Sequence, residues 1–174
     1  MGNKKLIILT GDIQTGKTTA LFNWAVDRSD VAGVLTPVKE GKRFFYSIPE
    51  KHWCNMEADE TDTAPLGVGR FLFSAAQFEK ANSSIIKWVN EGSWKYLVID
   101  EIGPLELVQK KGLWLAVCHL LEQELNTTII LVVRKALSNE VLLLFEAEKY
   151  SVRLTSPDEF PGLIEEHSYL SDNK

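Results

Sequence analysis

The stretch of sequence that decides the fold is Leu6–Trp24, LIILTGDIQTGKTTALFNW. An apolar run ends at Gly11, and a helix-like pattern begins at Lys17. A short apolar run that stops at a glycine is typical of a buried strand. The stretch therefore predicts a strand over residues 5–10, a glycine-containing turn and a helix over residues 17–27.

The turn matches the spacing G-x-x-x-x-G-K-[ST]. In such a loop the glycines let backbone N–H groups point toward one anion, the lysine neutralises charge on the β- and γ-phosphates, and the next hydroxyl ligates Mg²⁺. The match lies between a predicted strand and a predicted helix, as this mechanism requires, although a plain strand-to-helix turn is the alternative. We expect the following residues to bind phosphate: Gly11, Asp12, Ile13, Gln14, Thr15, Gly16, Lys17, Thr18 and Thr19.

A second apolar strand, YLVIDE at residues 96–101, ends in two acids. Ligands of open α/β sheets lie at the carboxyl ends of the strands, so this pair is expected beside the phosphate loop. We predict that Asp100 and Thr18 hold Mg²⁺, and that Glu101 activates a water aligned on the γ-phosphate. A structural ion pair or cap is the alternative for Glu101, and Glu106 fits a helix-start acid equally well.

Hydrolysis also needs cations that stabilise negative charge spread over the γ-phosphate oxygens. The candidates are Arg43, Arg70, Arg134 and Lys135. Arg134 ends a third apolar strand, TTIILVVR, and is therefore expected at the ligand edge; for each cation a surface position is the alternative. Aromatic residues at 44–46 and at Trp53 could stack on a base, but packing in the core or in a hairpin is the simpler interpretation.

Three near-continuous apolar strands alternate with helices along the chain. Strands that are apolar on both faces imply helices on both sides of a mainly parallel sheet, so we predict a three-layer α/β fold with a small antiparallel hairpin excursion. A turn at Gly41 is followed by a strand, and the polar, aperiodic residues 50–65 are predicted to form a loop. The remaining predicted elements are strands over 31–37, 68–74 and 150–155, helices over 75–91, 113–125 and 139–149 with Ser138 as N-cap, and a candidate helix in the tail.

Bulk composition limits the possible function classes. The chain has 174 residues, 45% apolar and 25% charged, as expected for one domain spanning residues 1–174. There is no apolar run long enough to span a membrane, and the two cysteines fit a reducing cytoplasm better than a disulfide framework. Net charge is −5, most of it in the acidic tail at residues 156–174. Because no basic block occurs, nucleic-acid binding is not expected.

Beyond these motifs, the chain resembles the THEP1-like, or cancer-related, nucleoside-triphosphatases. VIDEIGPLEL at residues 98–107 is similar to the family's V-I-D-E-I-G-x-M-E-L stretch and is the most specific part of the resemblance. Four further stretches fit in the same order: GDIQTGKTT, GVLTPVKEGKRFFYSI, VGRFLFSAAQFE and TTIILVV. The chain departs from the family pattern at Pro37 and Val38, at Phe44 and Phe45, and at Pro104 and Leu105.

The resemblance implies a RecA-like P-loop fold and Mg²⁺-dependent hydrolysis of nucleoside triphosphates such as ATP and GTP to diphosphate and phosphate. Lys17, Thr18, Asp100 and Glu101 fall on matching motif positions, and Arg43 matches a family arginine. The predicted catalytic residues are Glu101, Lys17, Arg43 and Arg134.

Two other function classes stay open at this point. A kinase of this architecture usually needs an arginine-rich lid and an acceptor pocket, and no run of the chain combines several arginines. A nucleotide-gated switch of the guanine-specific kind is disfavoured, because no N-K-x-D stretch occurs.

Overall fold

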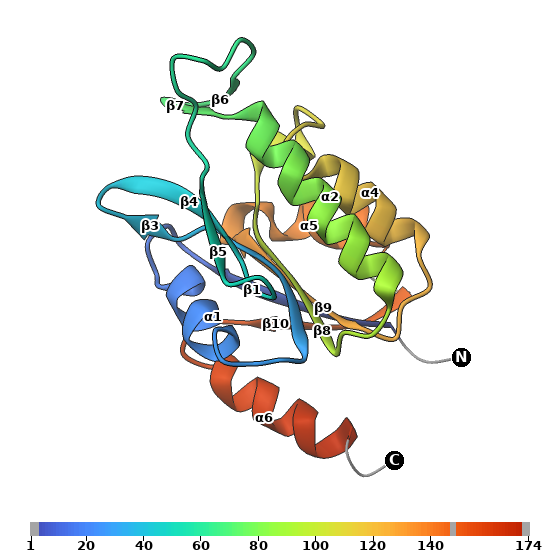
Figure 1. The fold of residues 1–174 in the computed structure, drawn as a ribbon. Coiled ribbons are helices and arrows are strands. Elements are labelled where there is room, and N and C mark those ends of the chain that lie inside the picture. The colour runs from blue at the N-terminus through green and yellow to red at the C-terminus, as the bar shows by residue number, and fades with distance from the viewer. Residues whose placement is uncertain (1–3, 147–148, 172–174) are drawn as a thin grey trace.

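The computed structural model describes residues 4–146 and 149–171. Its strands form one large mixed sheet and a separate two-stranded sheet (Figure 1). In chain order the strands are β1 (Lys4–Gly11), β2 (Val31–Leu35), β3 (Val38–Lys39), β4 (Lys42–Ser47), β5 (His52–Asn55), β6 (Leu66–Val68), β7 (Phe71–Phe73), β8 (Tyr96–Ile102), β9 (Thr128–Arg134) and β10 (Tyr150–Thr155).

The large sheet has the strand order β10-β1-β9-β8-β2-β4-β3 in the described part of the chain, with β5 beside β4. The strands from β10 to β2 run parallel to one another, and β4 joins β2 in the antiparallel sense. The predicted mainly parallel sheet is therefore confirmed. In the described part of the chain, antiparallel pairing occurs in the excursion through β3, β4 and β5, in the β6–β7 hairpin and in an isolated bridge between Glu57 and Phe73.

Helices cover both faces of this sheet, which confirms the three predicted layers (Figure 1). They are α1 (Lys17–Ala25), α2 (Ala75–Glu91), α3 (Pro104–Leu107), α4 (Trp114–Glu122), the 3₁₀ helix η1 (Lys135–Leu137), α5 (Ser138–Leu144) and α6 (Phe160–Ser171). One face carries α2, α4 and α5, and the other carries α1 and α6.

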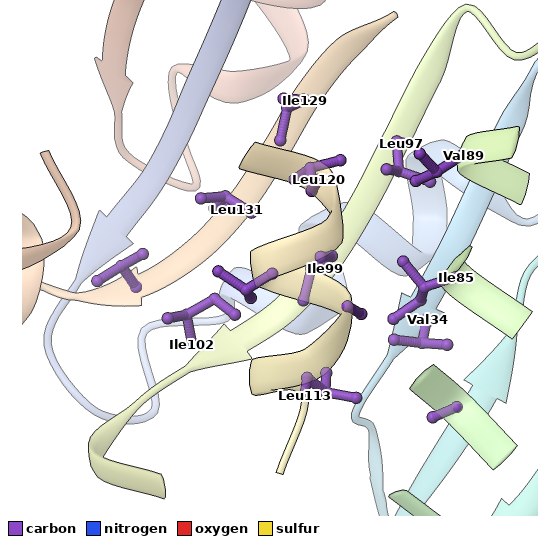
Figure 2. Close-up of a cluster of buried hydrophobic side chains, with 14 of the residues drawn as sticks. Val34, Ile85, Val89, Leu97, Ile99, Ile102, Leu113, Leu120, Ile129 and Leu131 are labelled. Carbon is purple, nitrogen blue, oxygen red and sulfur yellow. The ribbon is translucent and has the colours of Figure 1, made fainter. Parts of the chain in front are cut away.

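Two apolar clusters account for this layering. Successive residues of a strand point to opposite faces of the sheet. Leu6 and Ile8 of β1 therefore pack in one cluster with α2, α4 and α5, whereas Ile7 and Leu9 pack in the other with α1 and α6. Figure 2 shows part of the first cluster, where side chains of α2 and α4 meet the strands.

The sequence prediction for α2 is confirmed in both its bounds and its buried face. The helix spans Ala75–Glu91 and ends at Gly92, whose left-handed conformation is common just after a helix. The predicted apolar face is buried, and it consists of Phe78, Ala81, Ile85, Trp88 and Val89.

The antiparallel segments differ from the sequence prediction. Residues 50–65 were expected to be a loop, yet His52–Asn55 forms β5. This short edge strand is held by backbone pairing with β4 rather than by an apolar pattern, so the sequence carries little trace of it. The single strand predicted over residues 68–74 is a hairpin instead, because Gly69 and Arg70 form a tight turn between β6 and β7.

Several predicted helices are shorter in the structure. α1 ends at Ala25 and α4 spans Trp114–Glu122. The helix predicted over residues 139–149 ends at Leu144, and residues 147–148 lie outside the described part. Ser138 is the first residue of α5 rather than its N-cap, and its hydroxyl lies 3.1 Å from the Thr10 hydroxyl of β1.

The acidic tail begins with a helix that packs against the rest of the fold. Residues 160–171 form α6, as the sequence suggested, and Phe160 and Ile164 are buried in the cluster that contains α1. Among the described residues, none of the helices is both long enough and apolar enough to cross a membrane.

Candidate active site

The phosphate loop lies where β1 ends and α1 begins. Gly16 is the N-cap of α1 with φ 83°, a left-handed conformation that strains any residue with a side chain. The first intrahelical bond runs from the Ala20 N–H to the Gly16 carbonyl at 2.9 Å, and no side chain caps the helix start. The N–H groups of the first turn are thus free to bind an anion, and the helix dipole favours one there.

Lys17 is folded onto this loop. Its Nζ donates to the Gly11 carbonyl at 3.1 Å, to the Asp12 carbonyl at 2.5 Å and to the Thr15 hydroxyl at 3.2 Å. Burial lowers the pKa of Lys17, and the nearby Asp100 carboxylate partly counteracts that effect. The ammonium group is therefore kept at the centre of the loop, held by neutral oxygens that a phosphate oxygen can replace.

Asp100 is the buried acid of the site, with 1% of its surface exposed. Its Oδ2 accepts hydrogen bonds from the Thr36 N–H at 2.8 Å and from the Thr36 hydroxyl at 3.1 Å. Burial raises the pKa of Asp100 to about 6, although the Thr36 donors and the Thr18 hydroxyl each lower it. Oδ1 has no hydrogen-bond partner among the described residues.

This unpaired oxygen makes the site suitable for a divalent cation. A buried carboxylate oxygen without a donor is costly, and a metal ion removes that cost. Thr18 supplies a second hard oxygen beside it, since both residues line the same cavity. Carboxylate, hydroxyl and phosphate oxygens are the ligands that Mg²⁺ prefers.

Glu101 faces the same cavity although it follows Asp100 directly. Consecutive residues of a regular strand point to opposite faces, so one of the two acids would be turned away. The β8–β9 pairing shifts register between Ile99 and Ile102, and Glu101 has φ 68°. This bulge turns the chain so that both carboxylates line the cavity. A positive φ at a residue other than glycine is strained, as is common at functional sites.

Two arginines form ion pairs with Glu101. The Arg43 Nη1 lies 2.8 Å from Oε2, and the Arg134 Nη2 lies 3.1 Å from Oε1. Arg134 ends β9 opposite Gly11 of β1, which brings it to the phosphate loop. Arg43 comes from β4, outside the parallel part of the sheet, and stacks on Phe71 with its Cζ 5.3 Å from the ring centre.

A single cavity of about 520 Å³ joins these groups. It is lined by residues 13–19 of the loop and by Asp100, Glu101, Arg43 and Arg134. Gly11 and Asp12 contribute through the carbonyls that Lys17 binds. The structure therefore brings every predicted site residue to one end of the sheet.

The other candidates lie elsewhere. Arg70 sits in the turn of the β6–β7 hairpin, with its Cζ 5.1 Å from the centre of the Phe71 ring, and does not line this cavity. Lys135 is exposed in η1. Glu106 is 3% exposed and has a structural place: its carboxylate accepts the Gly103 N–H and the Leu113 N–H, both at 3.0 Å.

Sequence reasoning missed several residues of the site. Thr36 orients Asp100, and the only sequence signal is a polar residue that ends the apolar run VAGVL. Phe22 lines the cavity from α1, and a helical phenylalanine gives no hint of that position. Trp53 was named only as a candidate, and it also lines the cavity.

Comparisons with known proteins agree with this fold. A family model described as NTPase matches residues 6–158. The crystal structure of THEP1 from the hyperthermophile Aquifex aeolicus is similar with a TM-score of 0.70 and 19% identity, over 92% of this chain and 95% of that one. The solution structure of a human cancer-related nucleoside triphosphatase is similar with a TM-score of 0.62 and 15% identity, over 94% of this chain and 96% of that one. A comparison with curated protein sequences gives no significant match.

The two solved structures share the fold at low identity, and the family model covers most of the chain, including both acidic residues and the phosphate loop. The predicted family is therefore confirmed: the chain belongs to the NTPase family of THEP1-like enzymes and is a nucleoside-triphosphatase.

Proposed function

We propose that the protein hydrolyses nucleoside triphosphates to diphosphate and phosphate in a Mg²⁺-dependent reaction with water as the acceptor. The observation that carries this proposal is the place of Glu101, a carboxylate turned into the phosphate cavity between two arginines and beside the buried Asp100. The phosphate loop is enough to bind a nucleotide. Hydrolysis also needs an acid that is positioned to take a proton from water.

Substrate binding would begin at the phosphate loop. The free N–H groups of α1 receive the β-phosphate, and Lys17 exchanges its loop oxygens for phosphate oxygens. Thr18 and Asp100 are the residues that would hold Mg²⁺, which neutralises charge on the β- and γ-phosphates when bound. Thr36 keeps Asp100 oriented for this task through the two bonds to Oδ2.

The two arginines hold Glu101 in place before substrate binds. Each of its carboxylate oxygens accepts a bond from a different arginine and keeps a further lone pair that can accept a proton from water. The γ-phosphate oxygens compete for the same guanidinium groups, since charge-assisted pairing to phosphate is strong. We infer that Arg43 or Arg134 also contacts the γ-phosphate when substrate is present.

In the hydrolytic step, the water oxygen forms a bond to the γ-phosphorus while the bond from that phosphorus to the β–γ bridging oxygen breaks. The water proton passes to the Glu101 carboxylate, and the leaving oxygen stays on the diphosphate. The guanidinium groups stabilise the charge on the three equatorial oxygens during transfer.

Phosphate release tests the proposal. Purified protein is incubated with ATP, GTP, CTP and UTP, each with Mg²⁺ and with excess EDTA, and inorganic phosphate is measured. We expect release from all four nucleotides with Mg²⁺ and a loss of activity with EDTA. Release that appears only when a candidate acceptor such as a nucleoside monophosphate is added, together with a phosphorylated product, would assign a kinase instead.

A further inference from the structure

We propose that Trp53 and Phe22 form the platform on which the base of the nucleotide stacks. This inference rests on the proposed function, because it extends the phosphate cavity to its other end.

The two rings border the same cavity as the phosphate loop. Phe22 follows Thr18 by four residues in α1, so the two side chains share a helix face about one turn apart. Trp53 enters from β5, and the centres of the two rings are 5.8 Å apart. A nucleotide whose phosphates occupy the loop therefore has an aromatic surface within reach along α1.

Trp53 packs against other side chains and still exposes part of its ring. Its ring centre lies 5.0 Å from that of Tyr46 and 6.0 Å from that of Phe44, and the Lys39 Nζ lies 6.0 Å from it, yet 41% of the Trp53 surface is exposed. Tyr46, by contrast, is only 3% exposed and belongs to the core. A large ring that is held by its neighbours and remains partly exposed is suited to stacking.

The side chains at this end of the cavity favour stacking on the face of a base over hydrogen bonds to its edge. Pro37 and Val38 also line it, and 60% of Val38 is exposed. Among the described residues that line the cavity, Gln14 of the phosphate loop and Asn23, next to Phe22, carry side-chain amides. Every base has an aromatic face, so such a surface accepts all of them and holds the larger purines more tightly.

The test separates base from phosphate by titrating the protein, in Mg²⁺, with ADP, GDP and pyrophosphate in a calorimeter. In Trp53→Ala we expect the affinity for ADP and GDP to fall together by roughly 5- to 100-fold, the range that removal of a stacked aromatic produces. Pyrophosphate, which has no base, keeps its affinity within about twofold. Trp53→Phe recovers most of the loss, whereas Trp53→Leu, which keeps apolar bulk without a ring, does not.

Trp94→Ala is the matched control, because Trp94 precedes β8 and so lies at the opposite edge of the sheet; it leaves all three affinities unchanged. Unchanged ADP affinity in Trp53→Ala, or an equal loss for pyrophosphate, overturns the platform. Because the titrations need no turnover, ADP binding without phosphate release would refute the hydrolase and leave the platform intact.

Discussion

The buried carboxyl group of Glu106 should make the free energy of unfolding depend on pH. The substitution Glu106→Gln isolates this contribution. The carboxylate is 3% exposed and accepts two backbone N–H bonds, but its burial outweighs them and raises its pKa to about 7 from 4.5. A raised pKa in the folded state means that the folded protein binds the proton more tightly than the unfolded chain does.

The sign and size of the effect follow from that shift. The contribution of Glu106 to stability is fully present below the unfolded pKa, and it is lost as pH rises through the folded pKa of about 7. A change of one pKa unit corresponds to about 1.4 kcal/mol, so between pH 5 and pH 8 the free energy of unfolding loses roughly 2 to 3 kcal/mol from this group. A glutamine side chain at this position cannot ionise, so the variant lacks this component.

Urea denaturation followed by tryptophan fluorescence at pH 5, 6, 7 and 8 measures the effect. Other acids titrate alike in both proteins, so the difference between wild type and Glu106→Gln is the quantity to plot. We expect wild type to lose stability relative to the variant as pH rises, with most of the change between pH 5 and pH 7 and little above pH 7. Parallel curves, or a change of opposite sign, would show that the two backbone bonds dominate and that the argument from burial is wrong.

Four further substitutions, one of them a control, test other parts of the molecule. Lys17→Ala should reduce phosphate release by at least about 100-fold, because the loop then lacks the cation that meets the β- and γ-phosphates. Arg43→Ala should lower kcat on the order of 100-fold, while Arg70→Ala, which removes an arginine outside the cavity, should stay near wild type in the same assay. Gly33→Ala places a Cβ 2.1 Å from the Val98 carbonyl at φ 138°, so chemical denaturation should show a loss of about 3 kcal/mol or more.

The parallel half of the molecule could be predicted from sequence because its signals are local. Three strands are buried on both faces and therefore appear in the sequence as apolar runs: β1, β8 and β9. The spacing of the loop motif placed Lys17 between the first strand and its helix. Parallel strands end at one edge, so Asp100 and Arg134 could be assigned to the site before any coordinates were known.

The antiparallel half could not be predicted in the same way. β5 is held by pairing with β4, and its four residues show no apolar alternation that would mark a strand. The bulge that turns Glu101 into the cavity depends on a register shift between two strands, which has no signature in either strand alone. One of the two ion pairs of Glu101 is made by Arg43, which lies on β4, outside the parallel strands.

Glu101→Gln probes the proposed role of Glu101 as the group that takes the proton from the attacking water. The variant keeps the shape of the side chain but not its charge, so ATP binding should persist while phosphate release falls about 100-fold or more, as removal of a general base predicts. Glu57→Gln is the matched control, since Glu57 accepts the Arg43 backbone N–H at 3.0 Å without touching Glu101, and it should remain near wild type. Phosphate release by Glu101→Gln at the wild-type rate would contradict the account.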